Sequence, residues 1–143
     1  MQHNVLHKMS QMGRSYLAVV DDERDLMELF SQALHANGFK IKEFNDPLLA
    51  LEDIFAYHLE YSMVLTDIRM PGMDGLHLSR LINQLDKEIK ILCMSAYEIY
   101  NAELEEIHID ELIKKPVRVS ELVKLITKHL AQTKINNSLT QAA

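Results

Sequence analysis

Cysteine is almost absent from this sequence, in which Cys93 is the only one among 143 residues. A single thiol cannot form a disulfide within the chain, and its position in the apolar run 91–94 predicts a small buried side chain. The sequence also lacks any apolar stretch near the roughly 20 residues that span a bilayer. Residues 1–13 are polar and contain no hydrophobic core of a signal peptide. We therefore expect a cytoplasmic protein without a membrane partner.

Positive charge is scarce as well. The chain has 15 Lys and Arg residues and 21 Asp and Glu residues, which gives a formal net charge of -6. No run of basic residues occurs. Direct binding to nucleic acid is therefore not expected, because phosphate backbones select basic surfaces. The hydrophobic fraction of 48% and the charged fraction of 25% are ordinary for a globular protein. The length corresponds to one domain.

Short apolar runs alternate with amphipathic stretches, a pattern that is typical of α/β domains with a parallel sheet. Strands are predicted at residues 17–20, 39–44, 63–67, 90–94 and 112–113. The second run alternates apolar and polar residues, so we expect it to be more exposed than the first, which is continuously apolar. Five such strands with right-handed crossovers form a doubly wound sheet flanked by five helices.

Helices are predicted in the ranges 26–34, 47–58, 76–85, 98–106 and 120–130, of which the fourth is the weakest. Asp46 and Ser120 are the predicted N-caps of the second and last helices. The pair Asn37 and Gly38 ends the first helix as a left-handed cap. We expect one domain over residues 14–130, a flexible leader at 1–13, and a polar tail or the start of a linker at 131–143.

Polar side chains collect where the predicted strands end. They are Asp21 and Asp22 after the first strand, Asp67 at the third, Ser95 after the fourth and Lys115 after the fifth. Doubly wound sheets bind ligands at this carboxyl edge. Three adjacent carboxylates repel one another, and a hard divalent cation such as Mg²⁺, or Mn²⁺ in its place, resolves the conflict.

The same five residues suit the transfer of a phosphoryl group to a carboxylate. A divalent cation and the ammonium of Lys115 would neutralise the transferring group, and the hydroxyl of Ser95 could donate to one of its oxygens. Asp21 and Asp22 leave their strand as a pair, which suits metal binding. Asp67 stands alone on the central strand before a loop, so it is the better candidate for the nucleophile.

Four segments carry a resemblance to a known family: VVDDE at 19–23, LTDIRMPGMDG at 65–75, MSA at 94–96 and KKP at 114–116. Together they resemble the receiver domains of bacterial two-component response regulators, over roughly residues 14–130. The resemblance implies a flavodoxin-like sheet of order 2-1-3-4-5. It also implies that Asp67 accepts the phosphoryl group, and that Asp21, Asp22, Asp67 and the main-chain carbonyl of Arg69 hold Mg²⁺.

The resemblance further implies a phosphohistidine donor, either a sensor histidine kinase or a histidine phosphotransfer protein, and a downstream protein that it does not identify. Slow self-catalysed hydrolysis of the acyl phosphate is implied, without turnover of an external substrate. The bond between Lys115 and Pro116 is expected to be cis.

The sequence departs from the family pattern on the expected output surface. Leu112 replaces the usual aromatic residue of the fifth strand, His108 replaces a common glycine, and the stretch from Ser95 to Lys115 is a couple of residues shorter than usual. We hypothesise that Leu112, or Tyr97 and Tyr100, report phosphorylation instead.

Three alternative functions use a similar sheet or a similar aspartyl phosphate. A pseudo-receiver would act as a protein-interaction module that is never phosphorylated. The retained Asp22, Asp67, Ser95 and Lys115 argue against it, whereas the altered output surface leaves it open. A phosphatase acting through an aspartyl phosphate would need a second acid near the nucleophile and a cap, whereas Arg69 stands two residues after Asp67. Flavin binding by a similar sheet is disfavoured, because the flavin phosphate would meet three carboxylates. Taken alone, Asp22 could instead cap the first helix.

Overall fold

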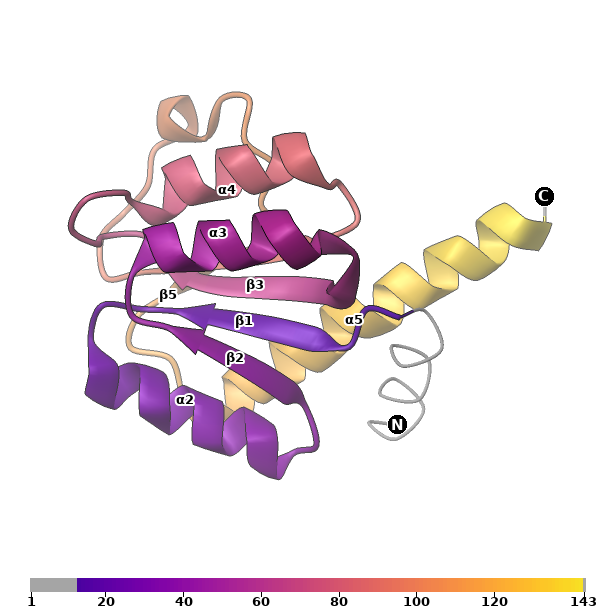
Figure 1. Cartoon of the computed structure of the whole chain (residues 1–143), viewed down its shortest axis with the longest axis horizontal. Helices are drawn as coiled ribbons and strands as arrows, with labels where there is room; N and C mark the ends of the chain where they lie inside the picture. Colours follow the sequence, from indigo (N-terminus) through magenta and orange to yellow (C-terminus); the bar gives the residue numbers. More distant parts are fainter. Residues whose placement is uncertain (1–12, 143) are drawn as a thin grey trace.

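A computed structural model describes residues 13–142, which form a central sheet between two layers of helices (Figure 1). The strands are β1 (Tyr16–Val20), β2 (Lys40–Phe44), β3 (Tyr61–Asp67), β4 (Lys90–Ser95) and β5 (Glu111–Lys114). All neighbouring strands pair in parallel, in the order β2-β1-β3-β4-β5. The predicted flavodoxin-like sheet and its strand order are therefore confirmed.

Burial explains why each strand has its pattern. Every residue of β3, at the centre of the sheet, is buried, so this strand tolerates apolar side chains on both faces. No residue of the edge strand β2 is fully buried, which agrees with its alternating sequence. The central position of β3 matters for the site, because Asp67 is its last residue.

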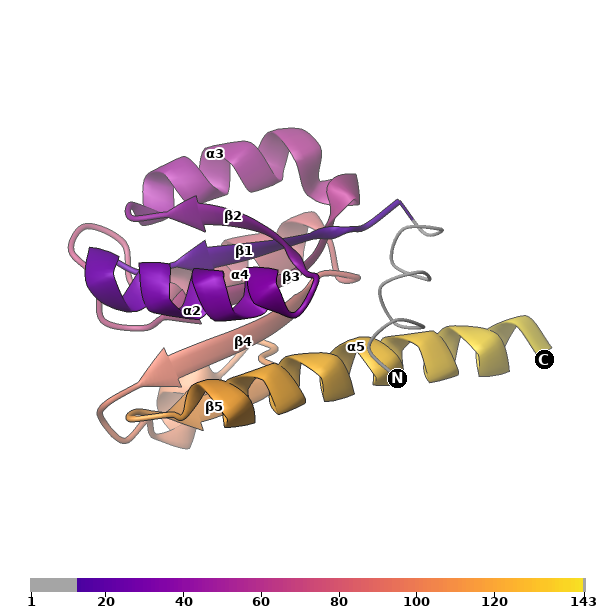
Figure 2. The ribbon, with the colours of Figure 1, turned by 90° about the horizontal axis from the view of Figure 1, so that it is seen from below.

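The helices are α2 (Arg24–Ala36), α3 (Pro47–Tyr57), α4 (Gly75–Leu85) and α5 (Val119–Ala142), with short 3-10 turns η1 (His58–Glu60) and η2 (Asn101–Leu104). Helices α3 and α4 cover one face of the sheet, and α2 and α5 cover the other (Figures 1 and 2). Each face has its own apolar core. Ile54 and Ile82 pack with β-strand residues on the first face, and Phe30 and Ile126 do so on the second.

Two predicted features of the helices are wrong. The weak helix expected at 98–106 is only the 3-10 turn η2, so the described chain has four helices and not five. Ser120 is not an N-cap, because α5 already begins at Val119. The predicted cap at Asp46 is confirmed, since its side chain accepts a hydrogen bond from the N–H of Leu48 at 2.9 Å.

The ends of the chain were predicted to be a leader and a tail. The leader at 1–13 lies almost wholly outside the described residues, and α5 continues through the predicted tail as far as Ala142. The division between domain and tail stays a prediction. Within residues 13–142, no helix is long and apolar enough to cross a membrane.

Candidate functional site: an acidic pocket at the carboxyl edge of the sheet

The acid pair follows directly after β1. Asp21 is fully buried, and its Oδ1 accepts a hydrogen bond from the N–H of Glu23 at 3.0 Å. Asp22 is exposed, and the N-cap of α2 is Glu23, so Asp22 does not cap that helix. The pair therefore presents one buried and one solvated carboxylate at the same edge.

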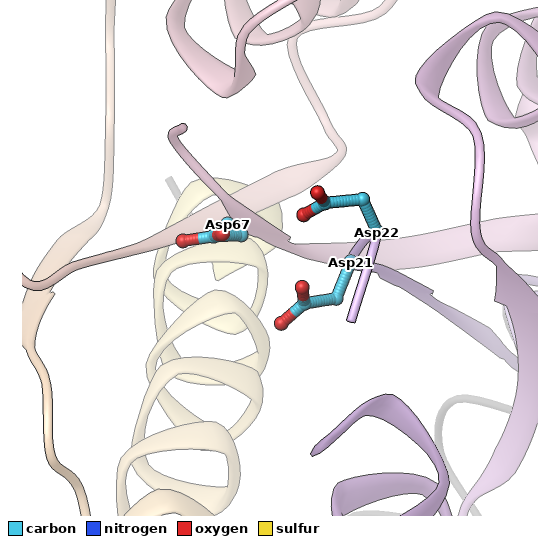
Figure 3. Close-up of side chains that lie close together, drawn as sticks. All are labelled: Asp21, Asp22 and Asp67. Carbon is cyan, nitrogen blue, oxygen red and sulfur yellow. The ribbon is translucent and has the colours of Figure 1, made fainter. Parts of the chain in front are cut away.

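Asp67 completes the acidic group from the end of β3. Its side chain is 8% exposed, and its Oδ1 accepts the N–H of Ile68 at 3.1 Å. One ligand atom from each of Asp21, Asp22 and Asp67 can be chosen so that all three lie within 4.8 Å of one another. Figure 3 shows that the three carboxylates converge from two neighbouring strand ends.

Lys115 brings a cation to this group from the segment after β5. Its Nζ lies 3.2 Å from Oδ1 of Asp67 and 3.7 Å from Oδ2 of Asp21. Its backbone N–H donates to the carbonyl of Ser95 at 2.8 Å, which ties it to β4. The peptide bond between Lys115 and Pro116 is cis, as the resemblance implied.

Ser95 is buried at the end of β4, on the strand that pairs with β3. Its hydroxyl donates to the carbonyl of Tyr97 at 2.8 Å and accepts the N–H of Tyr97 at 3.0 Å. The hydroxyl is thus engaged within its own turn. A phosphoryl group on Asp67 would have to draw it away from the Tyr97 carbonyl.

Arg69 and Tyr97 connect the two loops beside the pocket. The guanidinium carbon of Arg69 lies 5.6 Å from the centroid of the Tyr97 ring, within the range of a cation–π contact. Tyr97 is two residues after Ser95 and Arg69 is two residues after Asp67. The contact therefore joins the loop after the fourth strand to the loop after the third.

Gly75 is a residue of this site that the sequence reasoning missed. Its N–H donates to the carbonyl of Ile68 at 2.8 Å, and a Cβ at this position would overlap the carbonyl oxygen of Asp67 and approach the Cα of Ile68 to 2.9 Å. Only glycine allows α4 to begin this close to the end of β3. The sequence signal is the Asp74–Gly75 pair at the end of the motif 65–75, which is typical of a loop and does not by itself indicate a close backbone approach.

The electrostatics of the pocket favour an added cation. Burial raises the pKa of Asp21 to about 6, and it also raises the pKa of Asp67, although Lys115 opposes the second shift. The buried Oδ2 of Asp21 has no hydrogen-bond partner, because Lys115 lies beyond hydrogen-bonding distance. An orphaned carboxylate oxygen beside two further acids fits a hard divalent cation.

All six residues singled out from the sequence lie at this edge of the sheet. The roles assigned to them stay predictions. The geometry defines a class of protein: a doubly wound parallel domain with an acidic pocket at the carboxyl edge of its strands, in which Lys115 pairs with the acids.

Comparison with known proteins identifies the family. The response regulator receiver domain matches residues 17–127, and the chain belongs to this family. Receiver domains are part of two-component signalling, where they are phosphoacceptors and do not turn over an external substrate.

The matches to individual relatives cover different shares of those proteins. The C4-dicarboxylate transport regulator DctD of Rhizobium meliloti is 31% identical over 130 residues, which are 87% of this chain and only 28% of that protein. The receiver protein CpdR of Brucella abortus is 27% identical over 116 residues, which are 80% of this chain and 95% of that protein.

A solved relative supports the interpretation of the pocket. The response regulator TrrA of Thermotoga maritima, solved in complex with Mg²⁺ and BeF, is 30% identical with a TM-score of 0.70. The match covers 80% of this chain and 97% of that one. The acidic group of the present chain thus resembles a receiver Mg²⁺ site.

Proposed function

We propose that this domain accepts a phosphoryl group on Asp67 from a phosphohistidine, in a Mg²⁺-dependent reaction, and that the modification changes its partner-binding surface. The observation that carries the proposal is the position of the Asp67 carboxylate, 3.2 Å from Lys115 and within the group of three acids. The donor is a sensor histidine kinase or a histidine phosphotransfer protein. The reaction belongs in a reducing cytoplasm, with which the free thiol of Cys93 is compatible.

In the transfer step, an oxygen of the Asp67 carboxylate forms a bond to phosphorus as the phosphorus–nitrogen bond of the donor breaks. The electron pair of that bond stays on the imidazole, which leaves as the free histidine after taking up a proton. Lys115 balances the negative charge that accumulates beside Asp67. Attack of water on phosphorus later releases inorganic phosphate and restores the carboxylate.

Asp21, Asp22, Asp67 and the main-chain carbonyl of Arg69 are the residues that would hold the cation. Mg²⁺ bound there would neutralise phosphoryl oxygens and keep the reacting groups in line. The Oδ2 oxygen of Asp21 supports this assignment, because it is buried and accepts no hydrogen bond, while Nζ of Lys115 lies 3.7 Å from it. Mn²⁺ has the same preference for oxygen ligands and is expected to substitute.

Ser95 is the residue through which modification would reach the surface. Phosphorylation adds about 1.5 to 2 negative charges and three acceptor oxygens. If the hydroxyl of Ser95 turns toward them, its bond to the carbonyl of Tyr97 is lost, and the exposed Tyr97 ring is free to leave Arg69. Tyr97, Tyr100 and Leu112 are all exposed, at 65%, 69% and 41%, so each can report such a change.

The test is to incubate the chain with Mg²⁺ and a small acyl-phosphate donor and to measure its intact mass. We expect a gain of one phosphoryl group that is absent without metal and absent in Asp67→Asn. No gain in protein that binds Mg²⁺ would contradict self-assisted phosphorylation and favour a pseudo-receiver. Ser95→Ala, compared with Ser62→Ala as a control elsewhere in the core, should slow the gain.

The readout is tested separately, by nuclear magnetic resonance of tyrosine rings and leucine methyls before and after phosphorylation. The rings of Tyr97 and Tyr100 and the methyls of Leu112 should shift more than the ring of Tyr57, which is also exposed, at 52%, but lies on α3. Unchanged signals from all three reporters in phosphorylated protein would eliminate the proposed readout and leave the chemistry intact.

A further inference from the structure

Helix α3 has apolar side chains on faces that the sheet does not cover. Its buried residues are Pro47, Ala50 and Ile54. Leu48 and Phe55 nevertheless stand 52% and 67% exposed, respectively. A helix that is apolar nearly all round is normally enclosed by protein on all sides. The exposed face of α3 therefore lacks a covering partner among the described residues.

A groove lies beside this face, between α3 and α4. Its volume is about 660 Å³, and its lining consists of Leu51, Glu52, Phe55, Leu81, Gln84 and Leu85. The two helices pack side by side on the same face of the sheet (Figure 1). The lining residues of α4 belong to its second half, whereas α4 meets the acidic pocket at its first residue, Gly75. The groove is thus a surface separate from the pocket.

We propose that this groove binds an amphipathic helix of a partner protein, with apolar side chains on one face and a Lys or Arg opposite Glu52. Lining residues at positions i and i+4 of both helices, Leu51 with Phe55 and Leu81 with Leu85, form two apolar walls. Such a trough accepts apolar anchors from a helix laid into it. This inference does not depend on the proposed phosphorylation.

The charge of the partner follows from Glu52. It is the one charged side chain in the lining, and it makes no ion pair among the described residues, whereas its neighbour Asp53 pairs with Lys42 at 3.2 Å. A cation from a partner helix would meet this free carboxylate at the edge of an apolar surface, where the interaction gains from reduced hydration.

Glu52 also argues against a second copy of this chain as the occupant. It stands at the midpoint of α3, so a two-fold axis through that midpoint would bring two Glu52 carboxylates together. Like charges that face each other across an interface weaken association. Six lining residues are also few against the roughly 20–30 residues per side of a stable interface.

The probe is a displayed library of helical peptides of about 14 residues, selected on the full chain. Affinities of the selected peptides are then measured for wild-type protein, Phe55→Ser, Glu52→Lys and Leu29→Ser. Leu29 is the matched control, because it is 52% exposed on α2, on the opposite face of the sheet. Thermal unfolding of each variant establishes that it is folded.

We expect selected peptides with apolar residues at i, i+4 and i+7 and a basic residue between them. Their affinity should fall about tenfold or more in Phe55→Ser and in Glu52→Lys, and stay unchanged in Leu29→Ser. A peptide in which Lys is replaced by Glu should recover binding in Glu52→Lys. Failure to select binders, or binding that survives Phe55→Ser, would overturn the proposal. So would a dimer in sedimentation that Phe55→Ser dissolves, because a second copy would then occupy the groove.

Discussion

At the scale of single residues, Asp21 combines a proposed role in metal binding with a cost in stability. Its carboxylate is fully buried, and its pKa is raised to about 6 because burial penalises the charged form. A carboxyl group whose pKa is raised in the folded state makes the protein less stable as pH rises from the unfolded pKa near 4 to about 6. Above that range the folded protein carries the full cost of an ionised, partly unsatisfied acid.

Asp21→Asn should therefore stabilise the metal-free protein at pH 8, by up to about 3 kcal/mol, because an amide removes the buried charge. Urea unfolding at pH 5 and pH 8 measures the effect, which should be larger at pH 8. Asp22→Asn is the control, since Asp22 is exposed and should change stability little. An equal gain in both variants would contradict the role assigned to burial.

Metal binding should depend on pH through the same residue. Ligand carboxylates must be ionised, so Mg²⁺ affinity is expected to fall as pH drops below about 6, with release of a proton on binding. Calorimetric titration in buffers of different ionisation enthalpy measures that proton. The Asp21→Asn variant should release fewer protons than the wild type when Mg²⁺ binds. Equal proton release from the variant and the wild type at pH 5.5 would assign the proton to another group.

At the scale of elements, the junction between β3 and α4 depends on a close backbone approach. Gly75→Ala should destabilise the protein by about 1–3 kcal/mol, because the new methyl group meets the backbone of Asp67 and Ile68. It should also slow phosphorylation, because Asp67 is displaced.

Gly72→Asn is the matched control for this junction. Gly72 has a φ of 85° with open space around it, a conformation that asparagine tolerates. Urea unfolding and the rate of mass gain are measured for both variants. If the Gly75→Ala variant is as stable and as reactive as Gly72→Asn, the close approach of Gly75 to Asp67 is not needed for stability or for phosphorylation.

A second junction, at the opposite end of the sheet, ties the start of β1 to η1 and the end of α4. Asp86 Oδ2 lies 3.0 Å from the guanidinium of Arg14 and 2.7 Å from Nδ1 of His58. Burial alone would raise the pKa of Asp86, but hydrogen bonds from His58, the N–H of Glu88 and Arg14 outweigh it and lower the pKa.

A lowered pKa means that the ionised form of Asp86 stabilises the fold above pH 4 and that this contribution disappears as pH falls below it. Asp86→Asn should cost about 1–3 kcal/mol at pH 7, since Arg14 is left with a weaker partner. Unfolding curves of wild type and variant should converge near pH 3. A difference that persists there would indicate packing and not charge.

The elements that sequence could predict are those defined by local pattern. The buried strands are continuous apolar runs, and Asp46 and Asn37 carry the chemistry of caps. The helix predicted at 98–106 does not form, because this stretch offers no apolar stripe to bury and a helix that cannot bury a face is marginal. Its charged residues are Glu98, Glu103, Glu105 and Glu106.

Features that depend on tertiary contact could not be predicted. The approach of Gly75 to Asp67 requires the α4 position, and the bond between Arg14 and Asp86 joins residues 72 positions apart. The Ser95 hydroxyl was expected to donate to a phosphoryl group, whereas here it donates a hydrogen bond to the carbonyl of Tyr97. By contrast, the carboxyl edges of parallel strands meet by necessity, so the acidic group followed from strand order alone.

At the scale of the whole molecule, the two proposals concern two separate surfaces. The acidic pocket lies at the carboxyl edge of the sheet, and the α3/α4 groove lies on one face. Phe55→Ser should therefore leave the rate and extent of phosphorylation unchanged while removing peptide binding. Intact mass measured over time tests this, and a slower gain in the variant would show that the two surfaces are coupled.

The central claim is that Asp67 is the phosphoacceptor, and direct mapping of the modified residue tests it. Protein treated with Mg²⁺ and acyl phosphate is reduced with borohydride, which converts an aspartyl phosphate to homoserine, and its peptides are sequenced by mass spectrometry. Homoserine at position 67 alone is the predicted result. Homoserine at position 21 or 22, or modification of another residue with position 67 unchanged, would contradict the account.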